Sequence, residues 1–377
     1  MTTQVFHNGH ILTERGFETD ACVLVEDGHI VAVLHGPPPA SGEHIDLQGG
    51  SLVPGFIDVQ VNGGGGVLFN NATSVEALAA IARGHRKYGT TGMLPTLISD
   101  DTDVMRRAID ATHDAIAQGV PGILGIHLEG PYLAAARKGT HNASKFRVPD
   151  ADDIALATAL DNGVTVITLA PECVPTHSVT AMVERGAIVC AGHTAANYAQ
   201  TRAGLEAGIT GFTHLFNAMT PLQGREPGVV GAALEDANSW VGVIVDGVHV
   251  HPASLRVAIA AKPRGKVVLV TDAMPMVGSD DSSFDLYGET ITAVDGVVRN
   301  AAGSLAGSAL DMASAVRNSV HLLGLPLDEA CRMAAQYPAE FLGLGHRLGR
   351  IATGYRADFV VLDANLHVRH SWIGGTE

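Results

Sequence analysis

Apolar and polar positions follow one rhythm in the middle of the chain and another at its two ends. The middle contains eight short apolar runs, at residues 56–61, 92–97, 122–128, 164–169, 187–191, 211–215, 241–245 and 266–270. Helical patterns separate most of them, over 74–88, 102–118, 152–160, 194–207 and 253–261. Strands that are apolar on both faces and alternate with helices indicate a parallel sheet covered by helices. Eight such units predict an α/β fold of the (β/α)8 TIM-like barrel type.

An open, doubly wound sheet is the alternative architecture for the same alternation of strands and helices. Nucleotide-binding members of that class carry a G-x-G-x-x-G turn that opens a helix. No such pattern opens a helix in this sequence. The closed barrel is therefore the favoured architecture.

The two ends of the chain are rich in short β-like runs that are separated by turn residues. Near the start these runs cover 4–6, 21–25 and 29–34, and near the end they cover 356–363 and 366–368. Such short runs between glycine and proline turns are typical of antiparallel sheets. We therefore expect a small β-sandwich domain built from residues 1–53 and 346–377, with residues 54–345 forming the catalytic barrel.

Composition narrows the class of protein and of partner. The chain has 377 residues, 46% of them hydrophobic, and a net charge of −15. No run approaches the roughly 18 apolar residues of a membrane span, the first residues lack a signal-peptide pattern, and the four cysteines are widely spaced. We expect a cytoplasmic protein. The negative charge disfavours nucleic acid and anionic membranes as partners, because both bind cationic surfaces.

Polar residues follow the apolar runs and form the candidate chemistry of the chain. They are Gln60, Asn62, His127, Glu129, His193, His214, Asp246, His249 and Asp272. The carboxyl ends of all barrel strands meet at one mouth, where active sites of this fold lie. The sequence therefore predicts that residues more than a hundred positions apart share a single pocket.

Glu129, His193 and His214 form a metal-ligand set within this group. One carboxylate and two imidazoles are typical of catalytic divalent sites that keep a position open for water. Asp272 is then a candidate to take a proton from that water and to pass it to a leaving nitrogen. Each residue taken alone also has a structural interpretation, and His127 is interpreted as structural.

Several strings of residues resemble one known family. They are Val53-Pro54-Gly55-Phe56-Ile57-Asp58, His127-Leu128-Glu129-Gly130-Pro131-Tyr132, Lys138-Gly139-Thr140-His141-Asn142, Gly192-His193-Thr194, Thr213-His214-Leu215-Phe216-Asn217-Ala218-Met219, Asp246-Gly247-Val248-His249, Thr271-Asp272-Ala273-Met274 and Leu305-Ala306-Gly307-Ser308. Their order and their spread over nearly the whole chain resemble the N-acetylglucosamine-6-phosphate deacetylases of the amidohydrolase superfamily.

The resemblance implies an amide hydrolase that converts N-acetyl-D-glucosamine 6-phosphate to D-glucosamine 6-phosphate and acetate. It implies a metal-activated water, a metal held by Glu129, His193 and His214, and Asp272 as general base and then acid. His141 is either a donor to the oxyanion or a contact to a sugar hydroxyl. The substrate contacts that it implies are Asn62, His141, Asn217, Ala218, Arg225, His249, Leu305, Ala306 and Gly307.

The resemblance also implies a homodimer in which Arg225 and His249 reach the phosphate, from the same subunit or from its partner. Arginine suits phosphate because its planar guanidinium offers paired donors. Taken without the resemblance, Arg225 is interpreted as a surface residue paired with a neighbouring glutamate.

One position departs from the superfamily pattern. Many amidohydrolases carry His-x-His at the end of the first strand to hold a second metal ion, and here the residues are Gln60-Val61-Asn62. Neutral amides are much poorer zinc ligands than imidazole. We therefore expect one divalent ion per subunit, zinc first, with Fe2+, Co2+ and Mn2+ as alternatives. The glycines at 63–66 are expected to form an active-site loop.

Two further functions stay open at this stage. One is an amidohydrolase that acts on another amide or N-acetylated substrate. The other is a barrel without catalytic activity that serves as a binding protein, which the complete metal set and the presence of Asp272 disfavour.

Overall fold

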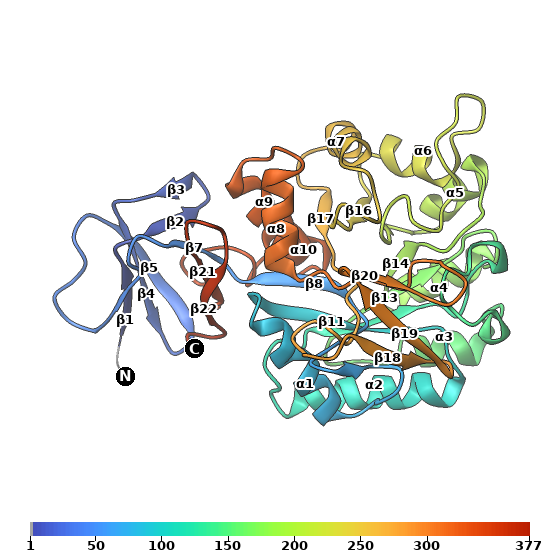
Figure 1. Ribbon diagram of the computed structural model, residues 1–377, viewed down its shortest axis with the longest axis horizontal. Helices are drawn as coiled ribbons and strands as arrows, with labels where there is room; N and C mark the ends of the chain where they lie inside the picture. Colours follow the sequence, from blue (N-terminus) through green and yellow to red (C-terminus); the bar gives the residue numbers. More distant parts are fainter. Residues whose placement is uncertain (1–2) are drawn as a thin grey trace.

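The central feature of the structure, a computed structural model that describes residues 3–377, is a parallel barrel (Figure 1). Its strands follow one another in chain order: β8 (Phe56–Val61), β11 (Thr90–Ile98), β12 (Gly125–Glu129), β13 (Val164–Leu169), β14 (Ile188–Ala191), β15 (Gly211–Phe212), β16 (Trp240–Val243) and β17 (Val267–Leu269). A bridge between Val61 and Ala273 joins β8 to the segment that follows β17, the two strands at the edges of this eight-stranded sheet. The predicted barrel is confirmed.

Helices cover the outside of the barrel. They are α1 (Val75–Arg86), α2 (Thr102–Ala117), α3 (Ala151–Ala157), α4 (Thr176–Glu184), α5 (Tyr198–Glu206), α6 (Gly228–Glu235), α7 (Pro252–Ala261), α8 (Met312–His321), α9 (Leu327–Ala334) and α10 (Gln336–Phe341). Capping residues set several starts: the side chain of Ser74 accepts a hydrogen bond from Ala77 N, and Asn197 forms a capping box with Gln200. None of the described helices is long and apolar enough to cross a membrane.

Two small sheets face each other, and the second of them combines strands from both ends of the chain. One has the order β5 (His29–His35), β4 (Ala21–Glu26), β1 (Gln4–His7), β6 (Glu43–Asp46), and the other β22 (Val368–Trp372), β21 (Phe359–Leu362), β7 (Ser51–Pro54), β2 (His10–Thr13), β3 (Gly16–Glu18). The ring of Phe6 contacts Phe359 and Trp372 edge-on, with centroids 5.1 and 5.2 Å apart. Aromatic rings from distant ends of the chain thus form a shared core, as expected for a sandwich.

An antiparallel three-stranded sheet is inserted after the last barrel strand and was not predicted. It consists of β18 (Ser283–Leu286), β19 (Glu289–Val294) and β20 (Val297–Arg299). Leu286, Ile291 and Val298 pack with Leu68 and Ile98, which lie close to the carboxyl ends of the first two barrel strands. The insert therefore stands beside the mouth of the barrel.

The expected glycine loop has a different role in the structure. Gly63 and Gly64 form β9, which pairs with β10 (Val67–Leu68). His85 of α1 binds the Gly63 carbonyl through Nε2 at 2.8 Å, and a Cβ on Gly64 would lie 2.6 Å from the same ring. The run lets the hairpin approach α1 closely and does not line the cavity described below, so the expectation of an active-site loop is corrected.

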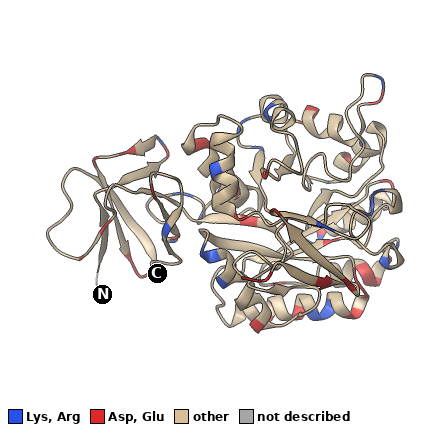
Figure 2. Ribbon diagram, in the orientation of Figure 1, with Lys and Arg blue, Asp and Glu red and all other residues tan. Residues whose placement is uncertain are grey.

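Figure 2 shows acidic and basic residues interspersed over the outer helices and loops.

Candidate active site

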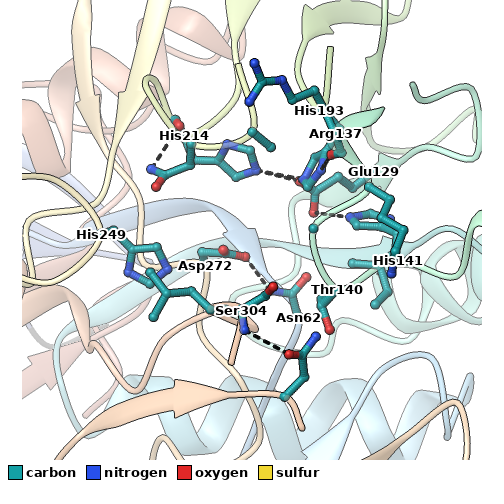
Figure 3. Close-up of a pocket in the computed structure, with 18 of the residues that line it drawn as sticks. Asn62, Glu129, Arg137, Thr140, His141, His193, His214, His249, Asp272 and Ser304 are labelled. Carbon is teal, nitrogen blue, oxygen red and sulfur yellow. Dashed lines mark hydrogen bonds and ion pairs between the residues drawn. The ribbon is translucent and has the colours of Figure 1, made fainter. Parts of the chain in front are cut away.

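A cavity of about 620 Å³ lies at the carboxyl ends of the barrel strands. It brings together Asn62, Glu129, His141, His193, His214, Asn217, Ala218, His249, Asp272, Leu305 and Gly307. Figure 3 shows the imidazoles of His141, His193 and His214 around Glu129, with Asp272 and His249 across the cavity. Ala306 is buried between Leu305 and Gly307 and does not line the cavity.

Three of these residues have a left-handed backbone conformation. The φ angles are 47° at His193, 33° at His214 and 54° at Asp272. Left-handed backbone is uncommon in residues other than glycine and costs roughly 1–3 kcal/mol each, so it persists only where neighbouring contacts enforce it. Hydrogen bonds from Ala134 N to the His193 carbonyl and from Ser308 N to the Asp272 carbonyl, at 3.0 and 2.8 Å, supply such contacts.

Glu129, His193 and His214 converge on one point. Glu129 Oε1 lies 3.2 Å from His193 Nε2 and 3.0 Å from His214 Nε2, and the two Nε2 atoms are 3.1 Å apart. All three side chains are buried. Burial raises the pKa of Glu129, but the two histidines lower it by more, so the net pKa lies well below its ordinary value. The cluster therefore holds an ionised carboxylate.

The hydrogen bonds around this cluster test whether it fits a metal ion. Nδ1 of His193 donates to the carbonyl of Arg137 at 2.8 Å. A neutral ring held in this way presents the lone pair of Nε2 to Glu129 and His214. Such an outward hydrogen bond is the usual partner of a metal-bound histidine. Three converging donors of the Glu/His2 type fit a divalent ion.

Asp272 sits beside the cluster with one oxygen occupied. Its Oδ1 accepts hydrogen bonds from Asn62 Nδ2 at 2.6 Å and from Gln60 Nε2 at 3.2 Å. Gln60 Nε2 also lies 3.3 Å from Glu129 Oε1. Burial raises the pKa of Asp272, and repulsion from Glu129 raises it further. Asp272 is thus oriented through one oxygen and disposed to accept a proton.

His141 has a defined tautomer. The backbone N–H of Ser99 donates to its Nδ1 at 3.3 Å, and Ser99 Oγ lies 2.9 Å from the same atom. An amide N–H can only donate, so Nδ1 accepts and the proton of the neutral ring sits on Nε2. Burial lowers the pKa of His141 well below its ordinary value, and repulsion from His193 lowers it further. His141 therefore offers a neutral N–H donor 4.0 Å from Glu129 Oε2.

Three supporting residues were missed from the sequence. Ser99 and Glu172 follow the second and fourth barrel strands, so the strand-end pattern contained the signal for both. Glu172 accepts hydrogen bonds from Thr194 Oγ1 and Ala195 N, each at 2.5 Å, directly after His193. Asp58 accepts from Thr271 Oγ1 at 2.5 Å and thereby ties the first strand to the segment that carries Asp272.

His249 and Arg225 differ in their relation to the cavity. His249 lines it, and its Nδ1 lies 2.6 Å from Asp246 Oδ2. Arg225 lies on an exposed loop between β15 and α6 and does not line the cavity of its own chain. The lysine and arginine side chains that line this cavity are Arg137 and Lys138.

Comparisons with known proteins agree with this geometry. Residues 51–376 match the model of the amidohydrolase family. An N-acetylgalactosamine-6-phosphate deacetylase from Shewanella sp. (strain ANA-3) is 44% identical over 97% of this chain and 93% of its own length.

Two solved structures are also similar. N-acetylglucosamine-6-phosphate deacetylase from Pasteurella multocida has a TM-score of 0.96 and 36% identity, covering 99% of this chain and 98% of its own. The Mycobacterium smegmatis enzyme, solved as an aspartate-to-alanine mutant with N-acetyl-D-glucosamine 6-phosphate, has a TM-score of 0.93 and 35% identity, covering 100% and 99%.

Proposed function

This chain belongs to the amidohydrolase family, and from that premise we propose that it hydrolyses N-acetyl-D-glucosamine 6-phosphate to D-glucosamine 6-phosphate and acetate. The observation that carries the proposal is the convergence of Glu129, His193 and His214 beside Asp272 in one cavity. The substrate class is taken from the names of the similar proteins. The cavity has room for the amide of such a substrate beside the proposed metal ligands.

One divalent ion per subunit completes the site, with Glu129, His193 and His214 as its ligands. Zinc is the favoured metal. Such an ion acidifies a water molecule and polarises a carbonyl. Fe2+, Co2+ and Mn2+ are compatible with the same ligands. The donors that Gln60 and Asn62 direct to Asp272 and Glu129 support a single ion, because amide N–H groups occupy the region of a second one.

Asp272 moves the proton in this mechanism. Its Oδ1 is held by Asn62 and Gln60, which leaves Oδ2 to take a proton from the attacking water. The same carboxyl then gives the proton to the amide nitrogen, so that the C–N bond breaks and a neutral amine leaves. The Nε2–H of His141 donates to the acetyl oxygen as negative charge develops there, which favours the oxyanion role over contact with a sugar hydroxyl.

The remaining residues of the cavity bind the sugar phosphate in this proposal. They are His249, Asn217, Ala218, Leu305 and Gly307, with Ala306 buried between the last two. Asn62 has a buried Oδ1 without a partner among the described residues, which suits a donor on the substrate.

A homodimer supplies Arg225 to the partner's cavity in this proposal. Arg225 is exposed and does not line its own cavity. Leu222 in the same loop and Val248 beside His249 are exposed apolar side chains, at 55% and 41%. Burial of these residues by a second copy would bring a guanidinium to the phosphate, whose charge it matches.

An acetate-release assay on N-acetylglucosamine 6-phosphate, with metal quantified on the same sample, tests the function. We expect turnover that depends on bound metal and falls sharply on unphosphorylated N-acetylglucosamine. Equal rates on both sugars would favour the broader alternative, an amidohydrolase for other N-acetylated substrates. Metal-loaded protein that releases no acetate would refute the proposal.

N-acetylgalactosamine 6-phosphate is the second candidate substrate. The observation that favours it is the 44% identity to a deacetylase named for that sugar. The two sugars are epimers at C4, and in both of them the amide that is hydrolysed is attached to C2. The ratio of kcat/KM values for the two phosphates, measured on one preparation, decides between them.

Domain organisation and location complete the proposal. We place a small β-sandwich domain at 1–53 and 346–377 and the catalytic barrel at 54–345, supported by the separate hydrophobic core around Phe6, Phe359 and Trp372. Four free cysteines, at positions 22, 173, 190 and 331, support a reducing compartment such as the cytoplasm.

A further inference from the structure

The three-stranded insert contacts the second barrel strand through an aromatic side chain at its tip. Tyr287 lies in the turn between β18 and β19, and its hydroxyl donates a hydrogen bond to the Ser99 carbonyl at 2.5 Å. Burial and the charge of Asp100 raise the pKa of Tyr287, and a hydrogen bond from the Asn142 backbone opposes the rise. The phenol is therefore a neutral donor held between the end of β11 and the loop that carries His141.

The turn that presents Tyr287 departs from the usual chemistry of its shape. The insert has two hairpin turns of the same kind: φ is 53° at Tyr287 and 80° at Gly288, and 50° at Asp295 and 76° at Gly296. Two successive left-handed residues are typical of a type I′ turn, which favours Asn-Gly or Asp-Gly. Asp295 fits this preference, whereas a bulky tyrosine is disfavoured at the same position. A residue that opposes the local preference of its turn points to a contact made elsewhere.

The contact of Tyr287 lies one residue away from a side chain of the proposed mechanism. Ser99 N donates to Nδ1 of His141 at 3.3 Å, and Ser99 Oγ lies 2.9 Å from the same nitrogen. The His141 ring is buried and lines the cavity, with Nε2–H as its donor. Ser99 thus binds the imidazole through its N–H and hydroxyl, while its carbonyl is bound by the insert. A hydrogen bond that fixes Ser99 from the insert therefore fixes the ring as well.

We propose that Tyr287 is a positioning residue that holds Ser99, and through it the Nε2–H of His141, in the direction of the acetyl oxygen. This inference rests on the proposed function, because it supports the oxyanion donor of that reaction. Tyr287 itself does not line the cavity, but the same insert returns to the cavity at Ser304 and Leu305. The insert therefore both forms part of the cavity wall and aligns the donor.

Tyr287→Phe removes the hydroxyl and keeps the ring that packs in the core of the insert. We expect kcat for the sugar phosphate to fall by about tenfold with KM nearly unchanged, because a displaced oxyanion donor weakens the transition state more than the bound substrate. Tyr355→Phe is the matched control. The Tyr355 hydroxyl donates to the Gly345 carbonyl at 2.8 Å outside the cavity, and its loss should leave both constants unchanged.

Tyr287→Asn is the second variant, since asparagine suits a left-handed turn position. It should retain the hairpin and show a loss of kcat at least as large as that of Tyr287→Phe. A variant that improves the local turn and still loses turnover separates the positioning role from a role in folding the insert.

The ring of His141 provides a measurement that does not require turnover. Its signals in long-range proton–nitrogen correlation spectra of the zinc-loaded protein are assigned by their loss in His141→Gln. We expect one Nε2–H form in the unaltered protein and in Tyr355→Phe. In Tyr287→Phe these signals should shift or broaden as the ring gains freedom. A role of Tyr287 in stability alone would lower the Tm and leave the signals unchanged.

Unchanged His141 signals in both Tyr287 variants would overturn the inference. A rise in KM at unchanged kcat would also overturn it, because Tyr287 would then act only on the cavity wall. In a double-mutant cycle, Tyr287→Phe should add little to the loss of kcat in His141→Gln, and additive losses would contradict the proposed route. Zinc-loaded protein that shows the altered signals in Tyr287→Phe but releases no acetate as the unaltered enzyme would refute the proposed function and leave the positioning of His141 by Tyr287 standing.

Discussion

The side-chain amide of Asn62 donates a hydrogen bond to Oδ1 of Asp272 across 2.6 Å, and this contact spans the seam where the first and last strands of the barrel meet. The backbone follows the same seam, since Asn62 N binds the Ala273 carbonyl at 2.9 Å. Asp272, the proton carrier in the proposed mechanism, is thus held by the strand that closes the barrel. The amides of Gln60 and Asn62 both donate to this carboxylate oxygen.

Asn62→Ala tests this contact. Asp272 loses a donor on Oδ1 and can rotate, so we expect kcat to fall by about ten- to a hundredfold, because small displacements of reacting groups have effects of that order. Steady-state kinetics at saturating metal provide the measurement. Asn238→Ala, an exposed asparagine outside the cavity, is the control. An unchanged kcat would show that Asn62 does not orient Asp272.

Asp272→Asn removes the proton carrier but keeps the shape of the side chain. We expect turnover to fall by about 10²- to 10⁴-fold or more, while metal content stays near that of the unaltered protein, since Asp272 is not among the three ligands. Acetate release and elemental analysis on one sample check both parts. Ordinary activity in this variant would contradict the role of Asp272.

His193→Ala and His214→Ala should each lower the bound metal. Either change removes one of the three proposed ligands. The metal affinity and the thermal stability should fall together, because an ion bound only to the folded state stabilises that state. Metal stoichiometry after dialysis and the Tm with and without chelator provide the measurements. His177→Ala, an exposed histidine outside the cavity, should leave both unchanged. Full stoichiometry in the two cavity variants would exclude these histidines as ligands.

Arg225→Gln should raise KM for the phosphorylated substrate by about tenfold or more and leave kcat nearly unchanged. Mixing Arg225→Gln with Asp272→Asn subunits gives a sharper test. If Arg225 enters the partner's cavity, a mixed dimer contains one complete site, with Asp272 from one subunit and Arg225 from the other. The mixture should then regain activity at substrate concentrations at which each variant alone has low activity. The absence of any recovery in verified mixed dimers would place Arg225 outside the partner's site.

His85 gives the stability of the fold a defined pH dependence. Burial lowers the pKa of His85, although the hydrogen bond to Gly63 opposes this. The unfolded chain then binds a proton more readily than the folded chain, so the free energy of unfolding falls as the pH drops below about 6.5, the ordinary pKa of histidine. Denaturation of metal-free protein at several pH values should show a shallower fall for His85→Gln. Identical slopes would exclude His85 as a source.

The barrel was predictable because its strands are buried on both faces. Residues 56–61 and 164–169 match the predicted runs fully, whereas β15 stops at Phe212 because the chain turns left-handed at His214. The three-stranded insert was missed, since its alternating polar and apolar residues form no continuous run. The candidate site residues were found from strand ends, but the orientation of His141, Asp272 and His193 depends on contacts of Ser99, Asp58 and Glu172. Those contacts exist only after strands from distant parts of the chain have been brought together.

The strand order of the five-stranded sheet has a consequence for folding during biosynthesis. β7 pairs on one side with β2, close in sequence, and on the other with β21, which begins only at Phe359. One edge of β7 stays unpaired while about 300 residues of the barrel are synthesised. This takes roughly 15–60 s at about 5–20 residues per second. An unpaired strand edge is a template for wrong pairing. The nascent chain is thus most exposed to aggregation in the interval before its last strands leave the ribosome.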